Sequence, residues 1–287
     1  MLKELLTLTD DGSLSLREPA LGELYHNKAG AYKEALINYA EPALALFDRS
    51  CDLTVLDSCF GLGYNSLVLA QELAKEKRRA QVLAVELDSN VLDLLPLILA
   101  QPVFSDSKLT GREAIEDAYR IISSNERRLS FGNSKYEIRQ TDLRDFLRTF
   151  VAPATIDLVF HDAFSPRKVP ELWTIDLFDK YKELLKANGA ILTYSSSAAV
   201  RGALQDLGFT VLRSAALGGK SGGTVAIKGE LASKARVCNL FRPIEGEELA
   251  RLQTSSRVAY RDENLRQSRE TIQSNRLLEQ KEYLQRR

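Results

Sequence analysis

Residues 55–65 read VLDSCFGLGYN and place two glycines, Gly61 and Gly63, between an apolar run and a helical stretch. Glycines at a strand-to-helix turn let a ligand approach the backbone closely, and the amino end of the following helix is electropositive. A dinucleotide fingerprint would carry a third glycine where this chain has Ser66. The turn therefore favours a nucleoside ligand without pyrophosphate over NAD or FAD, with a ligand-free tight turn as the alternative.

Short apolar runs recur along the chain around this turn and alternate with stretches long enough for helices. This alternation is typical of βαβ units, and it predicts an α/β fold with a mostly parallel, doubly wound sheet. Two later runs, 210–213 and 224–228, are expected to end the sheet as an antiparallel pair. The parallel strands are expected at residues 53–56, 81–86, 136–140, 156–161 and 190–194.

The sequence divides into three parts by composition. Residues 1–50 form an N-terminal segment expected to cover substrate or cofactor, with a helix from about 31 to 47. Residues 51–228 form the α/β domain, which contains a polar insert at about 105–133. Residues 229–287 are rich in Arg, Gln, Glu and Ser, and are expected to form a helical C-terminal extension with a helix-like stretch from Arg261.

Composition narrows the class of protein. The chain is 44% hydrophobic with 39 basic and 39 acidic residues, which is typical of a globular protein and excludes general disorder. No apolar run approaches the ~20 residues that span a bilayer, and residues 1–13 lack a signal-peptide core, so a cytoplasmic location is expected. Three cysteines and two histidines favour neither a disulfide framework nor a metal site. With zero net charge, RNA binding would require a local basic patch.

Acidic residues follow the second and third expected strands. Glu86 ends the run 81–86, where a carboxylate can accept hydrogen bonds from ribose hydroxyls. The alternative for Glu86 alone is a surface acid at a strand end. Asp142 follows the run 136–140 and could accept from an adenine amine while Leu143 packs on the ring. Asp142 could equally be the N-cap of the next helix.

The fourth expected strand leads into Asp162 and a proline-containing loop. Ligands of open parallel sheets bind beyond the carboxyl ends of the strands, so Asp162 is placed where chemistry would occur. His161 precedes it by one position and should face the opposite side, as a packed strand histidine. Cys59 in the glycine turn is interpreted as a small packed residue rather than a nucleophile.

The glycine turn and the strand-end acids together are typical of a Rossmann-like methyltransferase that uses S-adenosyl-L-methionine. More narrowly, the chain resembles the MnmC methyltransferase family over about residues 7–228. The resemblance rests on TDDGS at 9–13, YHNKAGA at 25–31 with Glu34-Ala35, CFGLGYN at 59–65, and DAFSPRKVPELW at 162–173 with Leu177-Phe178. The stretch 162–173 is its most specific part. Cys59 and Val169 depart from the family pattern, which has glycine and asparagine there.

The resemblance implies a function. Family members use S-adenosylmethionine to methylate the aminomethyl group of 5-aminomethyl(-2-thio)uridine at the tRNA wobble position, so the expected partner is a tRNA anticodon loop. Bifunctional relatives carry a flavin-dependent oxidase domain, but this chain is too short for it and has no second glycine fingerprint. We therefore expect a stand-alone methyltransferase that acts directly on the aminomethyl form.

The resemblance also implies a set of site residues. Asp162 would be catalytic, accepting hydrogen bonds from the attacking amine. The substrate side would comprise Phe164, Arg167, Lys168 and Trp173, with Lys220 as a further candidate phosphate contact. The cofactor side would comprise Asp57, Gly61, Gly63, Asn65, Glu86, Asp142, Leu143, Tyr25 and Glu34.

Three other functions stay open, of which a nicotinamide dehydrogenase is disfavoured by the missing third glycine. An aminopropyltransferase similar to spermidine synthase would share the fold and would also place an aspartate beside an amine. Its glycine turn typically carries an acid directly after the glycines, where this chain has Tyr64-Asn65. A further alternative is a non-catalytic RNA-binding protein on a methyltransferase scaffold. Against it stand four acids that are all present, Asp57, Glu86, Asp142 and Asp162.

Overall fold

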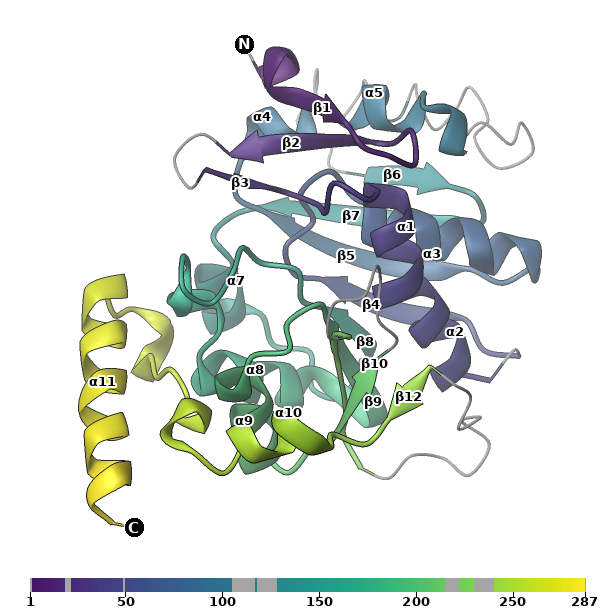
Figure 1. Ribbon diagram of the computed structural model, residues 1–287. Coiled ribbons are helices and arrows are strands. Elements are labelled where there is room, and N and C mark those ends of the chain that lie inside the picture. Colours follow the sequence, from purple (N-terminus) through teal and green to yellow (C-terminus); the bar gives the residue numbers. More distant parts are fainter. Residues whose placement is uncertain are drawn as a thin grey trace. The chain divides into compact units, whose positions relative to one another are not determined.

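The computed structural model describes residues 2–18, 22–48, 50–104, 117, 128–214, 222–229 and 240–286. The chain forms two compact units, Met1–Asp142 and Leu143–Arg287, called here the N-terminal and C-terminal halves and described separately. Figure 1 shows strands and helices alternating along both halves, which confirms the α/β prediction.

Parallel strands form the centre of the N-terminal half, where β4 (Leu53–Asp57), β5 (Ala80–Glu86) and β7 (Ser134–Gln140) pair in that order. The predicted runs 53–56, 81–86 and 136–140 all lie in these strands. The strand β6 (Arg128–Phe131) pairs antiparallel with β7 at the sheet edge. It lies inside the stretch that the sequence predicted to be a polar insert. The strand is hard to recognise in the sequence because only Leu129 and Phe131 of its four residues face the core. The rest of that insert, apart from β6 and its turn, lies outside the described residues except Asp117.

The N-terminal segment begins with a small antiparallel sheet, β1 (Leu6–Leu8), β2 (Leu14–Glu18) and β3 (Glu23–Leu24). Strands this short give no measurable periodicity, and the sequence did not predict them. The predicted helix 31–47 is present as α1 (Ala31–Ala35), η2 (Leu36–Ala40) and α2 (Glu41–Leu46). The middle piece, η2, is a π-helical turn. Pro42 has no N–H for the carbonyl four residues earlier, which interrupts the regular α-helical ladder at this point.

Helices pack around the strands of the N-terminal half. The helix α3 contacts β4, β5 and β6 and also packs against α1 and η2. The helices of this half not yet given are η1 (Leu2–Leu5), α3 (Tyr64–Lys75), α4 (Ser89–Leu92), α5 (Leu95–Leu99) and η3 (Pro102–Phe104).

The C-terminal half contains a mixed sheet of order β12-β10-β11-β9-β8. The strands β8 (Ile156–Phe160) and β9 (Leu185–Thr193) are parallel, as predicted. The predicted antiparallel pair is also confirmed, as β10 (Thr210–Ser214) and β11 (Thr224–Ile227). The short strand β12 (Phe241–Arg242) pairs with β10 and was not predicted. The helices of this half are α7 (Leu143–Thr149), η4 (Pro170–Leu172), α8 (Ile175–Leu184), α9 (Ala198–Asp206), α10 (Gly246–Arg251), η5 (Ser255–Arg257), η6 (Glu263–Leu265) and α11 (Arg269–Gln285).

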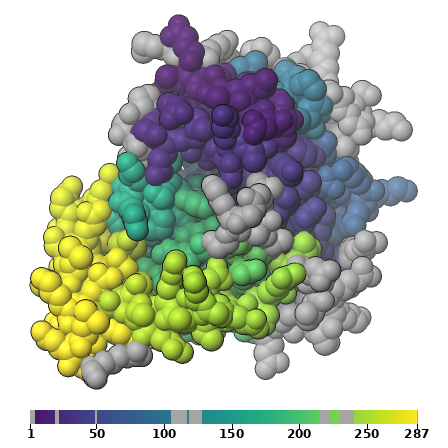
Figure 2. Space-filling model, viewed as in Figure 1, coloured from purple at the N-terminus to yellow at the C-terminus, as the bar shows by residue number. Residues whose placement is uncertain are grey.

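The described part of the C-terminal extension, residues 240–286, lies against the rest of its half and is seen in green-yellow and yellow in Figure 2. Its last helix, α11, begins later than the helix-like stretch expected from Arg261. The buried Asp262 carboxylate accepts hydrogen bonds from the N–H groups of Arg266 and Gln267. These bonds close residues 262–267 into a loop that precedes α11. Ser268 then caps α11 by accepting from the Thr271 N–H. Within the described residues, no helix is both long and apolar enough to cross a membrane.

An aromatic cluster forms the core of the C-terminal half around His161. The imidazole is completely buried and packs edge-on against the Trp173 ring, with centroids 4.5 Å apart. Its Nδ1 lies 3.0 Å from the Tyr181 hydroxyl, and Phe178 contacts it as well. Burial lowers the pKa of His161 from 6.5 to about 3. His161 is therefore a packed, neutral histidine, as the sequence indicated.

We predict a pH-dependent stability from this histidine. Because the folded-state pKa lies below the unfolded value, His161 adds no pH dependence above about pH 6.5, and its contribution to stability is lost as pH falls from there toward 3. Between pH 7 and pH 5 the loss is about 2 kcal/mol, at about 1.4 kcal/mol per pK unit. Urea unfolding of wild type and His161→Gln at both pH values measures it. The stability difference between the two proteins should shrink by that amount at pH 5, and an equal difference at both pH values would contradict the prediction.

Candidate functional site

The glycine turn joins β4 to α3 in the N-terminal half, as predicted. Gly61 and Gly63 have φ angles of 54° and 83°, in the region that favours glycine. A Cβ on Gly63 would lie 2.6 Å from Cζ of Phe60, and a Cβ on Gly61 would lie 3.3 Å from the Tyr25 ring. Both glycines are thus required by backbone conformation, and at Gly63 also by space. The rings of Phe60 and Tyr25 pack against this turn.

Glu86 is hydrogen-bonded directly to the glycine turn. One carboxylate oxygen accepts from the Gly61 N–H at 2.8 Å, and the other accepts from the Asp88 N–H at 2.8 Å. Burial raises the pKa of Glu86. An ionised carboxylate has about four acceptor sites, so these two bonds leave capacity for the hydroxyls of a ligand. Glu86 therefore combines two roles, as a brace for the turn and as an acceptor beside it.

The parallel register brings two other predicted residues to the same edge of this sheet. Glu86 lies opposite Gln140, and the Thr141 N–H donates to the Glu86 carbonyl at 2.9 Å. Asp142 follows immediately. Asp57 ends β4 and is completely buried. The carboxyl ends of β4, β5 and β7 thus gather predicted cofactor residues, as expected for parallel strands. Leu143, the first residue of the other half, is buried at the start of α7.

Two N-terminal motifs that carried the resemblance form a capping network for α1. The Ser13 hydroxyl accepts from the N–H groups of Ala31 and Tyr32, at 2.9 and 3.1 Å. Asp11 accepts from the Lys33 N–H at 2.9 Å and from the Ser13 hydroxyl at 2.6 Å. A Cβ on Gly30 would lie 2.0 Å from the Asp11 carboxylate, so the capping needs glycine there. Sequence reasoning did not identify this role, because an N-cap is expected directly before its helix, whereas Asp11 and Ser13 lie far before α1 in the sequence.

The remaining predicted cofactor residues of this half occupy different surroundings. The Tyr25 ring covers Gly61, and burial together with the nearby Glu86 raises the pKa of its hydroxyl. Asn65 lies nearly buried in the first turn of α3. One Glu34 oxygen accepts from the Asn27 N–H at 2.6 Å, within the segment that leads into α1. The structure thus brings Tyr25, Gly61 and Glu86 together and ties Glu34 to the N-terminal segment.

In the C-terminal half, Asp162 follows β8 and opens the loop that contains the most family-specific residues. Two aromatic residues, the buried Trp173 and the half-buried Tyr194, hold this loop by its carbonyls. The Trp173 indole N–H donates to the Phe164 carbonyl at 2.7 Å, and the Tyr194 hydroxyl donates to the Ala163 carbonyl at 3.0 Å. Trp173 is completely buried, so its contact with the loop comes from the core side. Tyr194 was missed, although it ends the expected strand 190–194.

The predicted substrate residues differ in their exposure. Arg167 and Lys168 are exposed, and Phe164 is half-buried. Lys220 lies outside the described residues. We call residues 162–173 the substrate segment below. Its outer part can present cations, while Trp173 at its end is packed inside.

A family model described as an S-adenosyl-L-methionine-dependent methyltransferase matches residues 111–229. The chain is also similar to MnmC2 from Aquifex aeolicus, a solved structure, with 29% identity and a TM-score of 0.76 over 96% of this chain and 85% of that one. This comparison covers the N-terminal segment and the C-terminal extension as well as the α/β domain.

Curated relatives agree with this similarity. An uncharacterised protein of Methanocaldococcus jannaschii is 31% identical over 239 residues, which is 79% of this chain and 62% of the relative. The tRNA 5-methylaminomethyl-2-thiouridine biosynthesis bifunctional protein MnmC of Burkholderia multivorans is 28% identical, over 81% of this chain and 35% of the relative. The chain thus spans less than two thirds of the first relative and about a third of the second.

Proposed function

The chain belongs to the MnmC-type S-adenosyl-L-methionine-dependent methyltransferases, and from this premise we propose that it methylates the aminomethyl nitrogen of 5-aminomethyl(-2-thio)uridine at the tRNA wobble position. The product would be the 5-methylaminomethyl nucleoside. The observation that carries the proposal is the match to MnmC2 over 96% of the chain, because it extends through both halves.

The glycine turn and the acids beside it fit the cofactor. Gly61 and Gly63 carry no side chains of their own, which favours close approach of a ligand to the turn they form. Glu86 would accept from the ribose hydroxyls, and Asp142 from the adenine amine, with Leu143 beside the ring. Tyr25, Asn65, Asp57 and Glu34 complete the proposed set. When bound, S-adenosylmethionine supplies a methyl group on a positively charged sulfur.

Asp162 is the proposed catalytic residue. The acceptor must be a neutral amine, because an ammonium group has no lone pair. A carboxylate can accept hydrogen bonds from the amine, which directs the remaining lone pair, and can take the proton that the nitrogen loses after methylation. The loop carbonyls held by Trp173 and Tyr194 keep the backbone after Asp162 in place. Positioning therefore contributes more to this reaction than strong basicity.

The proposed tRNA contacts lie in the substrate segment. A wobble base in an anticodon loop is unpaired, so it can turn outward and lie against an aromatic ring. Phe164 is half-buried and could contact it, while the exposed Arg167 and Lys168 could bind phosphates. The buried Trp173 supports this surface from beneath.

A direct assay tests the proposal. The protein is incubated with S-adenosylmethionine and tRNA that carries the aminomethyl nucleoside, and the tRNA is digested for nucleoside mass spectrometry. We expect a gain of one methyl group on that nucleoside and none on tRNA with unmodified wobble uridine. Transfer of an aminopropyl group from decarboxylated S-adenosylmethionine to a free amine, without tRNA methylation, would favour the aminopropyltransferase alternative.

Glu86→Ala should weaken S-adenosylmethionine binding in isothermal titration calorimetry. The variant loses the ribose contacts and also the brace on Gly61, and a charge-assisted hydrogen bond contributes about 1.5–3 kcal/mol. The expected rise in Kd is thus on the order of 10- to 100-fold. Glu137→Ala is the matched control, because Glu137 is an exposed acid on the neighbouring strand β7. Equal affinity in wild type and Glu86→Ala would refute the ribose assignment.

Asp162→Asn should retain the fold and much of the cofactor affinity, because the amide has nearly the volume of the carboxylate. Single-turnover methylation with saturating cofactor should fall about 10²- to 10⁴-fold, the range for a positioned acid–base group. The control is Asp157→Asn on the preceding strand β8, where the carboxylate pairs with Lys186 at 2.9 Å. If Asp162 only stabilised its loop, the melting temperature would fall while the rate on folded protein stayed near normal.

A further inference from the structure

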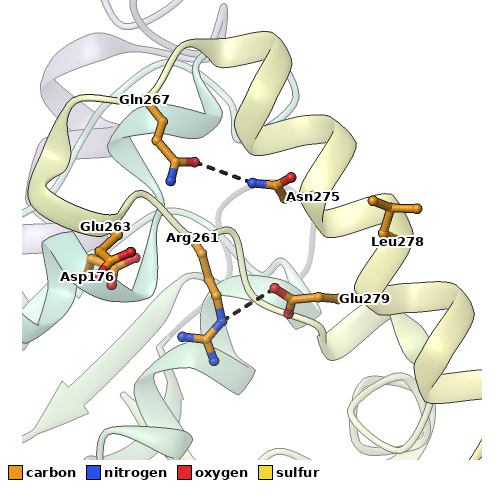
Figure 3. Close-up of a pocket in the computed structure, with 7 residues that line it drawn as sticks. All are labelled: Asp176, Arg261, Glu263, Gln267, Asn275, Leu278 and Glu279. Atoms are coloured by element: carbon orange, nitrogen blue, oxygen red, sulfur yellow. Dashed lines mark hydrogen bonds and ion pairs between the residues drawn. The ribbon is translucent and has the colours of Figure 1, made fainter.

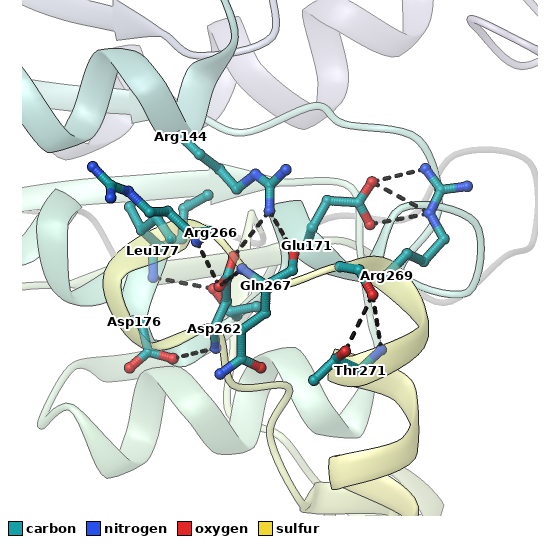
Figure 4. Close-up of polar contacts among 12 residues, drawn as sticks. Arg144, Glu171, Asp176, Leu177, Asp262, Arg266, Gln267, Arg269 and Thr271 are labelled. Atoms are coloured by element: carbon teal, nitrogen blue, oxygen red, sulfur yellow. Dashed lines mark hydrogen bonds and ion pairs between the residues drawn. The ribbon is translucent and has the colours of Figure 1, made fainter.

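The helix α11 lies beside the substrate segment, although it is far from it in sequence. It contacts η4, which is part of that segment. The guanidinium of Arg269, in the first turn of α11, binds the Glu171 carboxylate through two nitrogens, with contacts of 2.7 Å from Nη2 and 3.2 Å from Nε (Figure 4). Glu171 is 15% exposed and Arg269 40%, so the pair is partly shielded from water. A second contact runs from the Gln273 amide to the Arg167 carbonyl at 3.4 Å.

The start of α11 is itself held in one place by the buried Asp262. Arg144 of α7 donates to the Asp262 carboxylate and to the Gln267 carbonyl, each at 3.0 Å. Asp176 of α8 accepts from the Asp262 N–H at 2.7 Å (Figure 4). Breaking such a buried pair would be costly, since it leaves an uncompensated charge. The loop before α11 is therefore anchored on two helices, α7 and α8. This anchoring fixes the position of Arg269 independently of its contact with Glu171.

The rest of α11 makes its polar contacts elsewhere. Arg276 lies 4.5 Å over the Tyr260 ring and donates to the Val258 carbonyl, and Gln280 donates to the Ser255 carbonyl. A cavity of about 540 Å³ lies beside the middle of the helix, lined by side chains of α11, of α8 and of the preceding loop (Figure 3). The lining residues are Asp176, Arg261, Glu263, Gln267, Asn275, Leu278 and Glu279. Polar contacts from α11 to the substrate segment therefore come from its first turns, through Arg269 and Gln273.

On the basis of the proposed tRNA methylation, we infer that α11 positions the substrate segment for tRNA, with Arg269 acting as a positioning residue through Glu171. Glu171 follows the exposed Arg167 and Lys168 closely, and it precedes Trp173, whose indole holds the Phe164 carbonyl. The segment is therefore restrained from the core by Trp173 and from outside by Arg269. This assigns a role to the C-terminal extension, which the family model at residues 111–229 does not include.

The first test measures tRNA kinetics and cofactor affinity in Arg269→Ala. We expect KM for aminomethyl tRNA to rise about three- to tenfold, the scale of a partly shielded bidentate ion pair, with an unchanged Kd for S-adenosylmethionine. Exchanging the charges, with Arg269→Glu and Glu171→Arg together, should restore KM toward wild type. Arg286→Ala is the matched control, because it removes an arginine of the same helix whose partner is Glu282. A wild-type KM in Arg269→Ala, or an equal rise in Arg286→Ala, would overturn the inference.

The second test is independent of activity. In the substrate segment, the N–H groups of Lys168 and Val169 donate to the Ser165 carbonyl, and that of Trp173 donates to the Pro170 carbonyl. Hydrogen exchange of peptides covering 162–173 should be faster in Arg269→Ala than in wild type or Arg286→Ala, at equal melting temperature. Unchanged exchange overturns the positioning role. Faster exchange in a protein whose wild type does not methylate the tRNA supports the positioning role and rejects the proposed function.

Discussion

The hydrogen bond from the Gly61 N–H to the Glu86 carboxylate is the interaction on which the N-terminal half of the site depends. It joins the turn after β4 to the end of β5, and it exists because parallel strands end at the same edge of their sheet. The same register continues to β7, where Thr141 bonds to Glu86 and Asp142 follows. One pairing scheme therefore sets both the shape of the glycine turn and the position of the acids. Glu86 remains able to accept a ligand's hydroxyls because a carboxylate has more acceptor sites than the turn uses.

The substrate segment shows a different solution to the problem of holding a polar loop. Its carbonyls accept hydrogen bonds from two aromatic donors, the buried Trp173 and the half-buried Tyr194, which combine a large apolar surface with one polar group. Its outer side is held by Arg269 through Glu171. Residues that would face RNA can then remain exposed, while the backbone that carries them is fixed from two directions.

Polar residues of the N-terminal segment, among them the predicted cofactor residue Glu34, have structural partners in the backbone. Glu34 is bound to the Asn27 N–H, and Asp11 and Ser13 cap α1. Carboxylates and hydroxyls that could contact a ligand are equally good acceptors for backbone N–H groups. The N-cap residue of α1 is Gly30, which has no side chain to accept a hydrogen bond. Ser13 and Asp11, in the turn between β1 and β2, accept these bonds instead. The N-terminal segment is consequently built around the start of α1.

The sequence by itself determined the parallel strands of the α/β domain and the glycine turn after the first of them. Buried parallel strands need near-continuous apolar runs, and the turn at Gly61 and Gly63 needs positive φ angles, so both are visible locally. The tertiary structure alone decided which acceptor meets which donor. Arg269 and Glu171 are 98 residues apart, and the strands of the first hairpin are too short to show a period. His161 was recognisable as a packed residue, but its partner Tyr181 was not. Local periodicity encodes which face of an element is buried, whereas pairings between distant residues arise only when the packed elements bring them within hydrogen-bond distance.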